Sequence, residues 1–144
     1  MSTHRLPSLP CTCASLRRAS RALTQMYDDA LRPVGLRATQ FTVLQALSLT
    51  GDVTQGELGR LLAIDSTTLT RTLEIMAKKG WIAKKPGKDR RERRLHLAKA
   101  GEALFERALP HWERVQGSLR QRLGESRWNE LMQLTNELTE AVTN

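Results

Sequence analysis

Apolar residues recur every three or four positions along most of the chain, which is the spacing of amphipathic helices. The pattern predicts one helix from Ala14 that Pro33 and Gly35 end, a second from about Thr39 to Leu49, and helices again after Ala98. The first helix has one apolar face, made of Leu16, Ala19, Leu23, Met26, Tyr27, Ala30 and Leu31. The residues expected to face inward are Phe41, Val43, Leu44 and Leu47 in the second helix and Trp128, Leu131, Leu134 and Leu138 in the last.

Two more helix starts lie in the middle of the chain. Thr54 and Glu57 have the spacing of a capping box, which predicts a short helix through Leu62. After a break, Asp65 or Ser66 caps another helix, and a C-terminal glycine, Gly80, ends it. Its buried residues are predicted to be Leu69, Leu73 and Met76, and its polar face Thr67, Thr70, Arg71, Glu74 and Lys78.

Two short strands are predicted to follow, over residues 81–85 and 93–97, joined by a hairpin loop over 86–92. The order of helix, tight break, polar-faced helix, strand, basic loop and strand is typical of a winged helix-turn-helix. In the last helical region, Pro110 is expected to kink or offset one helix and Gly124 to separate it from the next.

Charge is concentrated in one segment of this 144-residue chain, whose formal net charge is +8. Residues 78–94 hold nine basic and two acidic side chains, whereas residues 1–77 hold eight and six and residues 95–144 hold six and seven. A basic hairpin taken alone is usually a solvated surface. Beside a polar-faced helix, it favours binding to double-stranded DNA, where it supplies a second contact to the backbone or the minor groove.

The predicted fold class is therefore mostly α with a small β-hairpin, in three parts. Residues 1–13 form an irregular N-terminal arm, and residues 38–97 form a winged helix-turn-helix DNA-binding region with its wing at about 84–94. Residues 14–37 and 98–144 form a helical dimerisation region from both termini. The apolar stripes of these termini are wider than one small domain readily covers, which indicates either a second copy of the chain or packing within one chain.

The candidate DNA-binding residues are Ser66, Thr67, Thr68, Thr70 and Arg71 in the helix and Lys88, Asp89, Arg90 and Arg91 in the hairpin. A threonine hydroxyl can bond a base or a phosphate, and its methyl group can contact a thymine methyl. Arginine is long enough for a bidentate contact with guanine. In a flexible loop, arginine can also enter a narrow minor groove, where the negative potential is strongest.

Composition disfavours several other classes of protein. With 40% hydrophobic and 26% charged residues, the chain is expected to be neither disordered nor a membrane protein, and to carry no signal peptide. The rival class is an enzyme or metal carrier, but His4, His96 and His111 lack partners at metal-ligand spacing. No phosphate-binding glycine loop or nucleophile elbow occurs. We expect no enzyme activity, no cofactor and a reducing, cytoplasmic setting.

These features resemble the multiple antibiotic resistance regulator (MarR) family of winged-helix proteins, over about residues 14–142. The most specific segment is Asp89-Arg90-Arg91 followed by Leu97 and Gly101, which is similar to the wing signature of the family. The runs Gly35-Leu36, Gln40-Phe41 and Ser66-Thr67-Thr68-Leu69-Thr70-Arg71 also fit. Ala98 stands where the family usually has threonine, so the next helix is expected to have a weaker cap.

The resemblance implies a homodimer whose first and last two helices interlock and which binds pseudo-palindromic operators, mostly as a repressor. It implies that Thr67, Thr68, Thr70 and Arg71 read the major groove, and that Arg91 enters the minor groove with Asp89 holding it in place. A small-molecule ligand or an oxidant, acting between the dimerisation and DNA-binding regions, is expected to weaken DNA binding.

Two cysteines, Cys11 and Cys13, lie just ahead of the first predicted helix. The helix dipole and the nearby Arg17 and Arg18 favour the reactive thiolate form. Three interpretations remain open: a redox switch, a soft-metal or metalloid site, and incidental thiols. Two thiolates alone are an incomplete metal site, and a disulfide within Cys-x-Cys is strained, so a bridge between subunits is easier.

The region around Cys13 also resembles the organic hydroperoxide sensor (OhrR) branch of the family. In that branch a lone cysteine on the first helix is oxidised, and Tyr27 matches a tyrosine that hydrogen-bonds it. The likeness is incomplete, because Arg17, Ala38 and Phe41 stand where that branch has further tyrosines, and Cys11 is not part of its pattern. The candidate redox or ligand-sensing residues are thus Cys11, Cys13 and Tyr27.

Overall fold

The computed structural model describes residues 5–89 and 91–143. In chain order, its elements are α1 (Thr12–Leu31), the 3-10 turn η1 (Arg32–Val34), α2 (Ala38–Thr50), β1 (Val53–Thr54), α3 (Gln55–Leu62), α4 (Ser66–Lys78), β2 (Ile82–Pro86), β3 (Arg93–Leu97), α5 (Lys99–Leu123) and α6 (Glu125–Thr143). The predicted fold class, mostly helical with a small β-hairpin, is confirmed. None of the helices in the described ranges combines the length and hydropathy needed to cross a bilayer.

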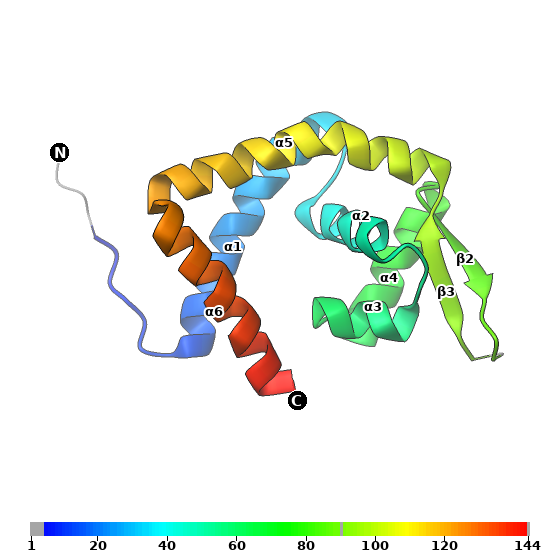
Figure 1. Ribbon diagram of the computed structural model, residues 1–144, viewed down its shortest axis with the longest axis horizontal. Helices are drawn as coiled ribbons and strands as arrows, with labels where there is room; N and C mark the ends of the chain where they lie inside the picture. The colour runs from blue at the N-terminus through cyan, green and yellow to red at the C-terminus, as the bar shows by residue number, and fades with distance from the viewer. Residues whose placement is uncertain (1–4, 90, 144) are drawn as a thin grey trace.

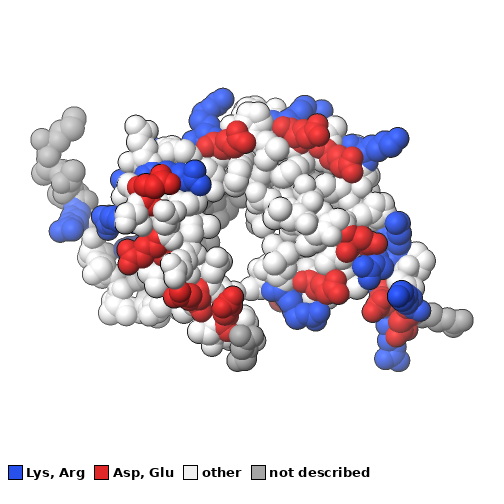
Figure 2. All heavy atoms as spheres, viewed as in Figure 1, with Lys and Arg blue, Asp and Glu red and all other residues white. Residues whose placement is uncertain are grey.

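The molecule has the shape of an arch (Figure 1). Helix α5 forms its top, α1 and α6 descend together at one end, and α2, α3, α4 and the sheet make up the other end (Figure 1). The sheet is antiparallel in the order β1-β3-β2, with Val53 opposite Leu95 and Ile82 opposite Leu97. Drawn as spheres, the two ends remain separated by an open gap (Figure 2).

Local capping signals place the helix ends as predicted. The Thr54 hydroxyl accepts the backbone N–H of Glu57 at 3.1 Å, and the Glu57 carboxylate accepts that of Thr54, also at 3.1 Å. The carboxylate of Asp65 caps α4 by accepting from the N–H of Thr68 at 3.0 Å. Gly80 takes a positive φ of 78° just after α4, a conformation that costs glycine little. These short-range hydrogen bonds fix the residues at which α3 and α4 begin.

Three elements differ from the sequence prediction. Helix α1 starts at Thr12, because Cys11 already serves as its N-cap, so the irregular arm is shorter than expected. Strand β1 was not predicted, since its two residues are too few to show alternation. Helix α5 runs unbroken through Pro110. No side-chain hydrogen bond caps α5 at Ala98, as the loss of threonine predicts.

The buried core lies at the winged end of the arch. The inward residues predicted for α2 and α4 are all buried, together with Leu58, Ile82 and Leu95. The prediction that Leu131, Leu134 and Leu138 of the last helix face inward is wrong within a single chain, because α6 has no buried residue. Helix α1 buries only Leu31. The exposed apolar side chains of these helices are Leu16, Leu23, Leu131, Met132, Leu134, Leu138 and Val142. Within the described residues, other parts of the chain cover these stripes only in part, since the exposed fractions of these side chains run from 36% at Leu23 to 73% at Val142.

A tight backbone contact joins the sheet to α5. The Trp81 carbonyl accepts the N–H of Ala98 at 3.0 Å, just before α5 begins. Gly101, in the first turn of α5, packs directly on that carbonyl, where an added Cβ would lie only 2.0 Å from the oxygen. The glycine of the wing signature is therefore explained by close approach of two backbones.

Candidate nucleic-acid interface

Helix α4 brings most of the predicted major-groove residues to one face. Ser66, Thr67, Thr70 and Arg71, with Glu74, line a shallow hollow of about 350 Å³. Leu69, Leu73 and Met76 are buried on the opposite side and hold the helix against the core. Exposed hydroxyl and guanidinium groups on a rigid helix are suited to contacts with base edges or phosphates.

Thr68 lies beside this hollow rather than in it. Its hydroxyl donates to Asp65 Oδ1 at 2.6 Å, while its backbone N–H donates to Oδ2 of the same carboxylate. The bond from the Thr68 hydroxyl is the main cause that lowers the pKa of Asp65 below its ordinary value. The proton of Thr68 is therefore used within the helix cap, which leaves only its lone pairs and its methyl group for DNA.

Thr70 has a partner that the sequence analysis did not identify. Gln55, the first residue of α3, donates from Nε2 to Thr70 Oγ1 at 2.9 Å in a partly buried position. The bond joins the two helices of the helix-turn-helix. Fifteen residues separate the partners, and no local pattern in the sequence signals the pairing.

The wing is the hairpin of β2 and β3. Gly87 N–H donates to the Glu92 carbonyl at 3.0 Å and closes the loop. The Asp89 carboxylate accepts the backbone N–H of Arg91 at 3.4 Å. Asp89 thus holds the backbone of Arg91, leaving its guanidinium free of an ion pair among the described residues. Lys88 and Arg91 are exposed, and Arg90 lies outside the described residues.

A hollow of about 520 Å³ separates the wing from α3. Three arginines, Arg60, Arg91 and Arg93, outnumber the two glutamates, Glu57 and Glu92, in its lining, which also includes Gln55 at the start of α3. Arg60 and Arg93 were not among the predicted site residues, although the charge of the segment around Arg93 could have indicated it. Because guanidinium groups bind phosphate with bidentate geometry, this hollow suits the DNA backbone.

The base of the wing is fixed to the rest of the sheet by an ion pair. Arg94 Nε lies 3.1 Å from Asp52 Oδ1, and Nη2 donates to the Asp52 carbonyl at 3.4 Å. Figure 2 shows Lys and Arg side chains, with Asp and Glu side chains among them, along the edge of the molecule where β2 and β3 lie. Five basic side chains of the wing, Lys84, Lys85, Lys88, Arg91 and Arg93, are exposed.

The structure does not bring the three candidate sensing residues together within one chain. Cys11 Sγ accepts the N–H of Ala14 at 3.5 Å, and Arg17 Nη2 donates to Cys13 Sγ at 3.1 Å. Both thiols are free and exposed. The hydroxyl of Tyr27 instead contacts Gln116 Oε1 on α5, and burial raises the pKa of this phenol. Among the residues the structure describes, no three His, Cys, Asp or Glu side chains could jointly hold a metal ion.

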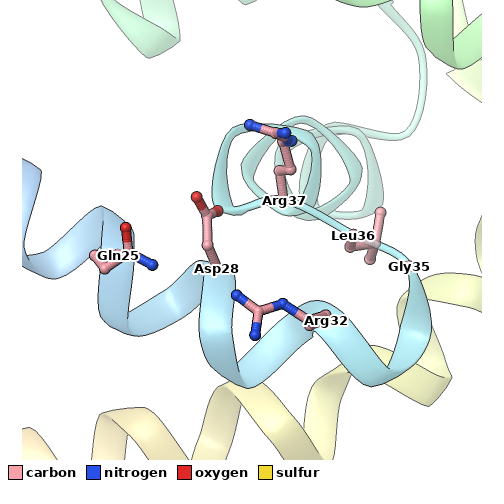
Figure 3. Close-up of a pocket in the computed structure, with 6 residues that line it drawn as sticks. All are labelled: Gln25, Asp28, Arg32, Gly35, Leu36 and Arg37. Carbon is pink, nitrogen blue, oxygen red and sulfur yellow. The ribbon is translucent and has the colours of Figure 1, made fainter.

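Two further hollows lie outside the winged region. One, of about 410 Å³, is formed where α1 meets α2, with Asp28 between Gln25 and Arg37 (Figure 3). Asp28 joins the two helices by accepting the N–H of Ala38 at 2.7 Å, whereas Arg32 pairs with Asp29, three residues before it, at 2.8 Å on the exposed surface. The other is an apolar groove of about 600 Å³ between α1, α2, α5 and α6.

Several known proteins are similar to this chain. Residues 34–92 match the MarR family. The chain is 31% identical over 91 residues to the HTH-type transcriptional regulator YwoH of Bacillus subtilis. The aligned residues make up 63% of this chain and 66%, just under two thirds, of YwoH. It is also 31% identical over 103 residues to an HTH-type transcriptional regulator of Bacillus cereus, covering 72% of this chain and 69% of the relative.

A solved structure extends the likeness to nearly the whole chain. The transcriptional regulator MosR of M. tuberculosis, in complex with DNA, superposes with a TM-score of 0.83 and 38% sequence identity, covering 91% of this chain and 95% of MosR. The polar-faced helix, the basic wing and these matches lead to one conclusion: the chain belongs to the MarR family and is a DNA-binding transcriptional regulator.

Proposed function

We propose that the protein is a homodimeric repressor that binds a pseudo-palindromic operator and is released from it by a small ligand or by thiol oxidation. The observation that carries this proposal is that α4 presents a polar face beside a basic wing, while the two terminal helices leave their apolar stripes partly exposed. The first feature suits duplex DNA, and the second calls for a partner.

The proposed partner is a second copy of the chain. The groove between α1, α2, α5 and α6 is lined mainly by apolar side chains, among them Leu16, Leu23 and Leu131. Exposed apolar stripes on two long helices are unusual in a monomer, since each square ångström removed from water stabilises the buried form by about 25 cal/mol. Terminal helices of two copies that cover one another remove this exposure, and the remaining groove could admit a small apolar effector.

A symmetric dimer presents α4 twice, as a pseudo-palindromic operator requires. We assign Ser66, Thr67, Thr70 and Arg71 to the major groove, with Thr68 at its edge. We assign Lys88, Arg90 and Arg91 in the wing to the minor groove, with Asp89 ordering the loop. Arg60 and Arg93, which line the hollow between α3 and the wing, are assigned to the intervening phosphates.

Arg71→Ala is expected to weaken operator binding by about 1–3 kcal/mol and to relax the base preference at one position of each half-site. Arg91→Ala is expected to weaken binding as well. The measurement is a titration of labelled duplexes, selected by the native protein from a random-sequence library, at several salt concentrations. The native affinity should fall steeply with salt, because each Lys or Arg on a phosphate releases counterions.

A matched control is Arg114→Ala, which removes an exposed arginine from α5 outside the proposed interface. It should leave both the affinity and the base preference unchanged. Native-like binding by both Arg71→Ala and Arg91→Ala would contradict the roles assigned to the helix and the wing.

Thiol oxidation is a second candidate function, favoured by the environment of the two cysteines. Both thiols are exposed, and Cys13 Sγ accepts a hydrogen bond from the Arg17 guanidinium at 3.1 Å. In the proposed step, the Cys13 thiolate attacks a hydroperoxide, forming a sulfenic acid and releasing an alcohol. A second thiol, Cys11 or one from a partner subunit, then forms a disulfide and releases water.

Cumene hydroperoxide is therefore expected to release DNA from the native protein but not from Cys13→Ser, as measured by loss of the shifted complex. Cys11→Ser separates the two thiols, since it keeps Cys13 but removes one resolving partner. Equal release from the native protein and Cys13→Ser would exclude Cys13 from the mechanism. A metal assay on the native protein and on the Cys11→Ser/Cys13→Ser form tests the alternative, a soft-metal or metalloid sensor.

A further inference from the structure

The threonines of α4 differ in how their hydroxyl protons are used. Thr68 donates to Asp65 at 2.6 Å, and Thr72 donates to the Thr68 carbonyl at 3.0 Å. Each of these two hydroxyls already donates its only proton to a group in α4 or in its N-cap. Thr70 is the reverse case, because its oxygen accepts from Gln55 Nε2 at 2.9 Å.

A hydroxyl has one donor proton and two acceptor lone pairs. With one lone pair of Thr70 engaged by Gln55, the proton is directed away from that amide. Within the part of the chain that the structure describes, no bond takes up the Thr70 proton, and Thr70 lines the hollow on the proposed DNA-binding face. A free threonine hydroxyl can donate or accept. The bond from the Gln55 amide therefore makes Thr70 a hydrogen-bond donor toward the proposed DNA-binding face.

The major groove distinguishes bases by this polarity. Both purines offer N7 as an acceptor, and the difference lies at the next position: guanine has the acceptor O6 and thymine the acceptor O4, whereas adenine and cytosine place an amino donor there. An outward donor is satisfied by a keto oxygen and opposed by an amino group. The threonine methyl group adds an apolar contact for the thymine methyl.

We propose that Gln55 sets the hydrogen-bond polarity of Thr70, so that Thr70 selects a keto base, guanine or thymine, at one position of each operator half-site. This inference rests on the proposed function, in which α4 lies in the major groove. Thr70 contacts the base, and Gln55 is a positioning residue that acts through it.

The test is selection of bound duplexes from a random-sequence library by the native protein and by variants, followed by sequencing. The native protein should enrich guanine and thymine at one position of each half-site, and Thr70→Val should lose that enrichment. In Gln55→Ala the hydroxyl can rotate and either donate or accept, so the preference should fall by about five-fold, the effect of one ordinary hydrogen bond. Other positions should be unchanged.

Gln55→Glu gives the sharper outcome, since it keeps the length of the side chain but reverses its role. The carboxylate accepts the Thr70 proton and leaves only lone pairs facing the DNA, so the preference should move toward adenine and cytosine. Repulsion between the carboxylate and the DNA phosphates lowers the affinity for all sequences equally. Such a uniform loss leaves the base profile unchanged, so the profile reports only the change in base preference. Arg60→Ala, on the same helix, should show only this uniform kind of loss.

A double variant, Gln55→Ala/Thr70→Val, should have the profile of Thr70→Val alone, because Gln55 acts through the hydroxyl. Base profiles of Gln55→Ala and Gln55→Glu that equal the native profile would overturn the proposal. So would an unchanged profile in Thr70→Val, in which case the native protein would still select an operator and the proposed function would stand. If the native protein selects no sequence, the proposed function fails first.

Discussion

Replacing Leu131 and Leu138 with glutamate is expected to make the protein monomeric and to lower its affinity for a full operator by about a hundred-fold or more. Both side chains line the apolar groove and are 42% and 37% exposed in the single chain. Because neither belongs to the buried core, the substitutions should leave the protomer folded. In a dimer, each carboxylate would be taken from water into an apolar contact, which is costly for a charge without a partner.

Loss of the dimer separates two half-site contacts that otherwise act at high effective concentration, and this is why affinity falls so far. Sedimentation equilibrium measures the oligomeric state, and titration of a selected duplex measures binding. Leu49→Glu is the matched control, since Leu49 is 82% exposed at the end of α2 and does not line the groove. A double variant that remains dimeric and binds like the native protein would show that subunits meet through another surface.

Gly101→Ala is expected to destabilise the protein by about 2–3 kcal/mol, the upper range for overpacking a tight site. An added Cβ would lie 2.0 Å from the Trp81 carbonyl oxygen, and that oxygen also accepts the N–H of Ala98. The α5 backbone must therefore move away from β2, at the point where the helix joins the sheet. A fall of about 10 °C in the unfolding temperature should follow for a domain of this size.

Gly117→Ala makes the same substitution on the same helix where there is space, because no described atom outside its own helix lies within 4 Å of the added Cβ. It should stabilise the protein by about 0.5–1 kcal/mol, as alanine is the better helix former. Thermal unfolding followed by circular dichroism compares the two. Equal unfolding temperatures for the Gly101 and Gly117 variants would mean that the contact at Trp81 relaxes without cost.

The winged region was predictable because its signals are local. The capping pair of Thr54 and Glu57 is three residues apart, and Gly80 ends α4 within one turn of its last helical residue. Such hydrogen bonds form between residues close in the chain, so they can be recognised from residue types at a fixed spacing. Strand β1 was missed for the opposite reason: Val53 pairs with Leu95, and a two-residue strand has no period of its own.

Periodicity identifies the apolar face of a helix but not the molecule that covers it. The stripe through Leu131 and Leu138 was correctly recognised as apolar, yet it is exposed in the single chain. The candidate site shows the same limit. Thr67, Thr70 and Arg71 follow from helical spacing, whereas the bond from Gln55 to Thr70 spans two helices and the ion pair of Asp52 with Arg94 spans 42 residues.

Helix α5 offers a way for an effector bound near the terminal helices to change the position of the wing on DNA. Its 25 residues make a rod of about 37 Å that meets α6 at one end and is clamped to the wing by Gly101 at the other. A rigid rod converts a tilt of a few degrees at the terminal helices into a displacement of a few ångströms at the wing. In a dimer, the angle between the two α5 helices would set the distance between the two wings.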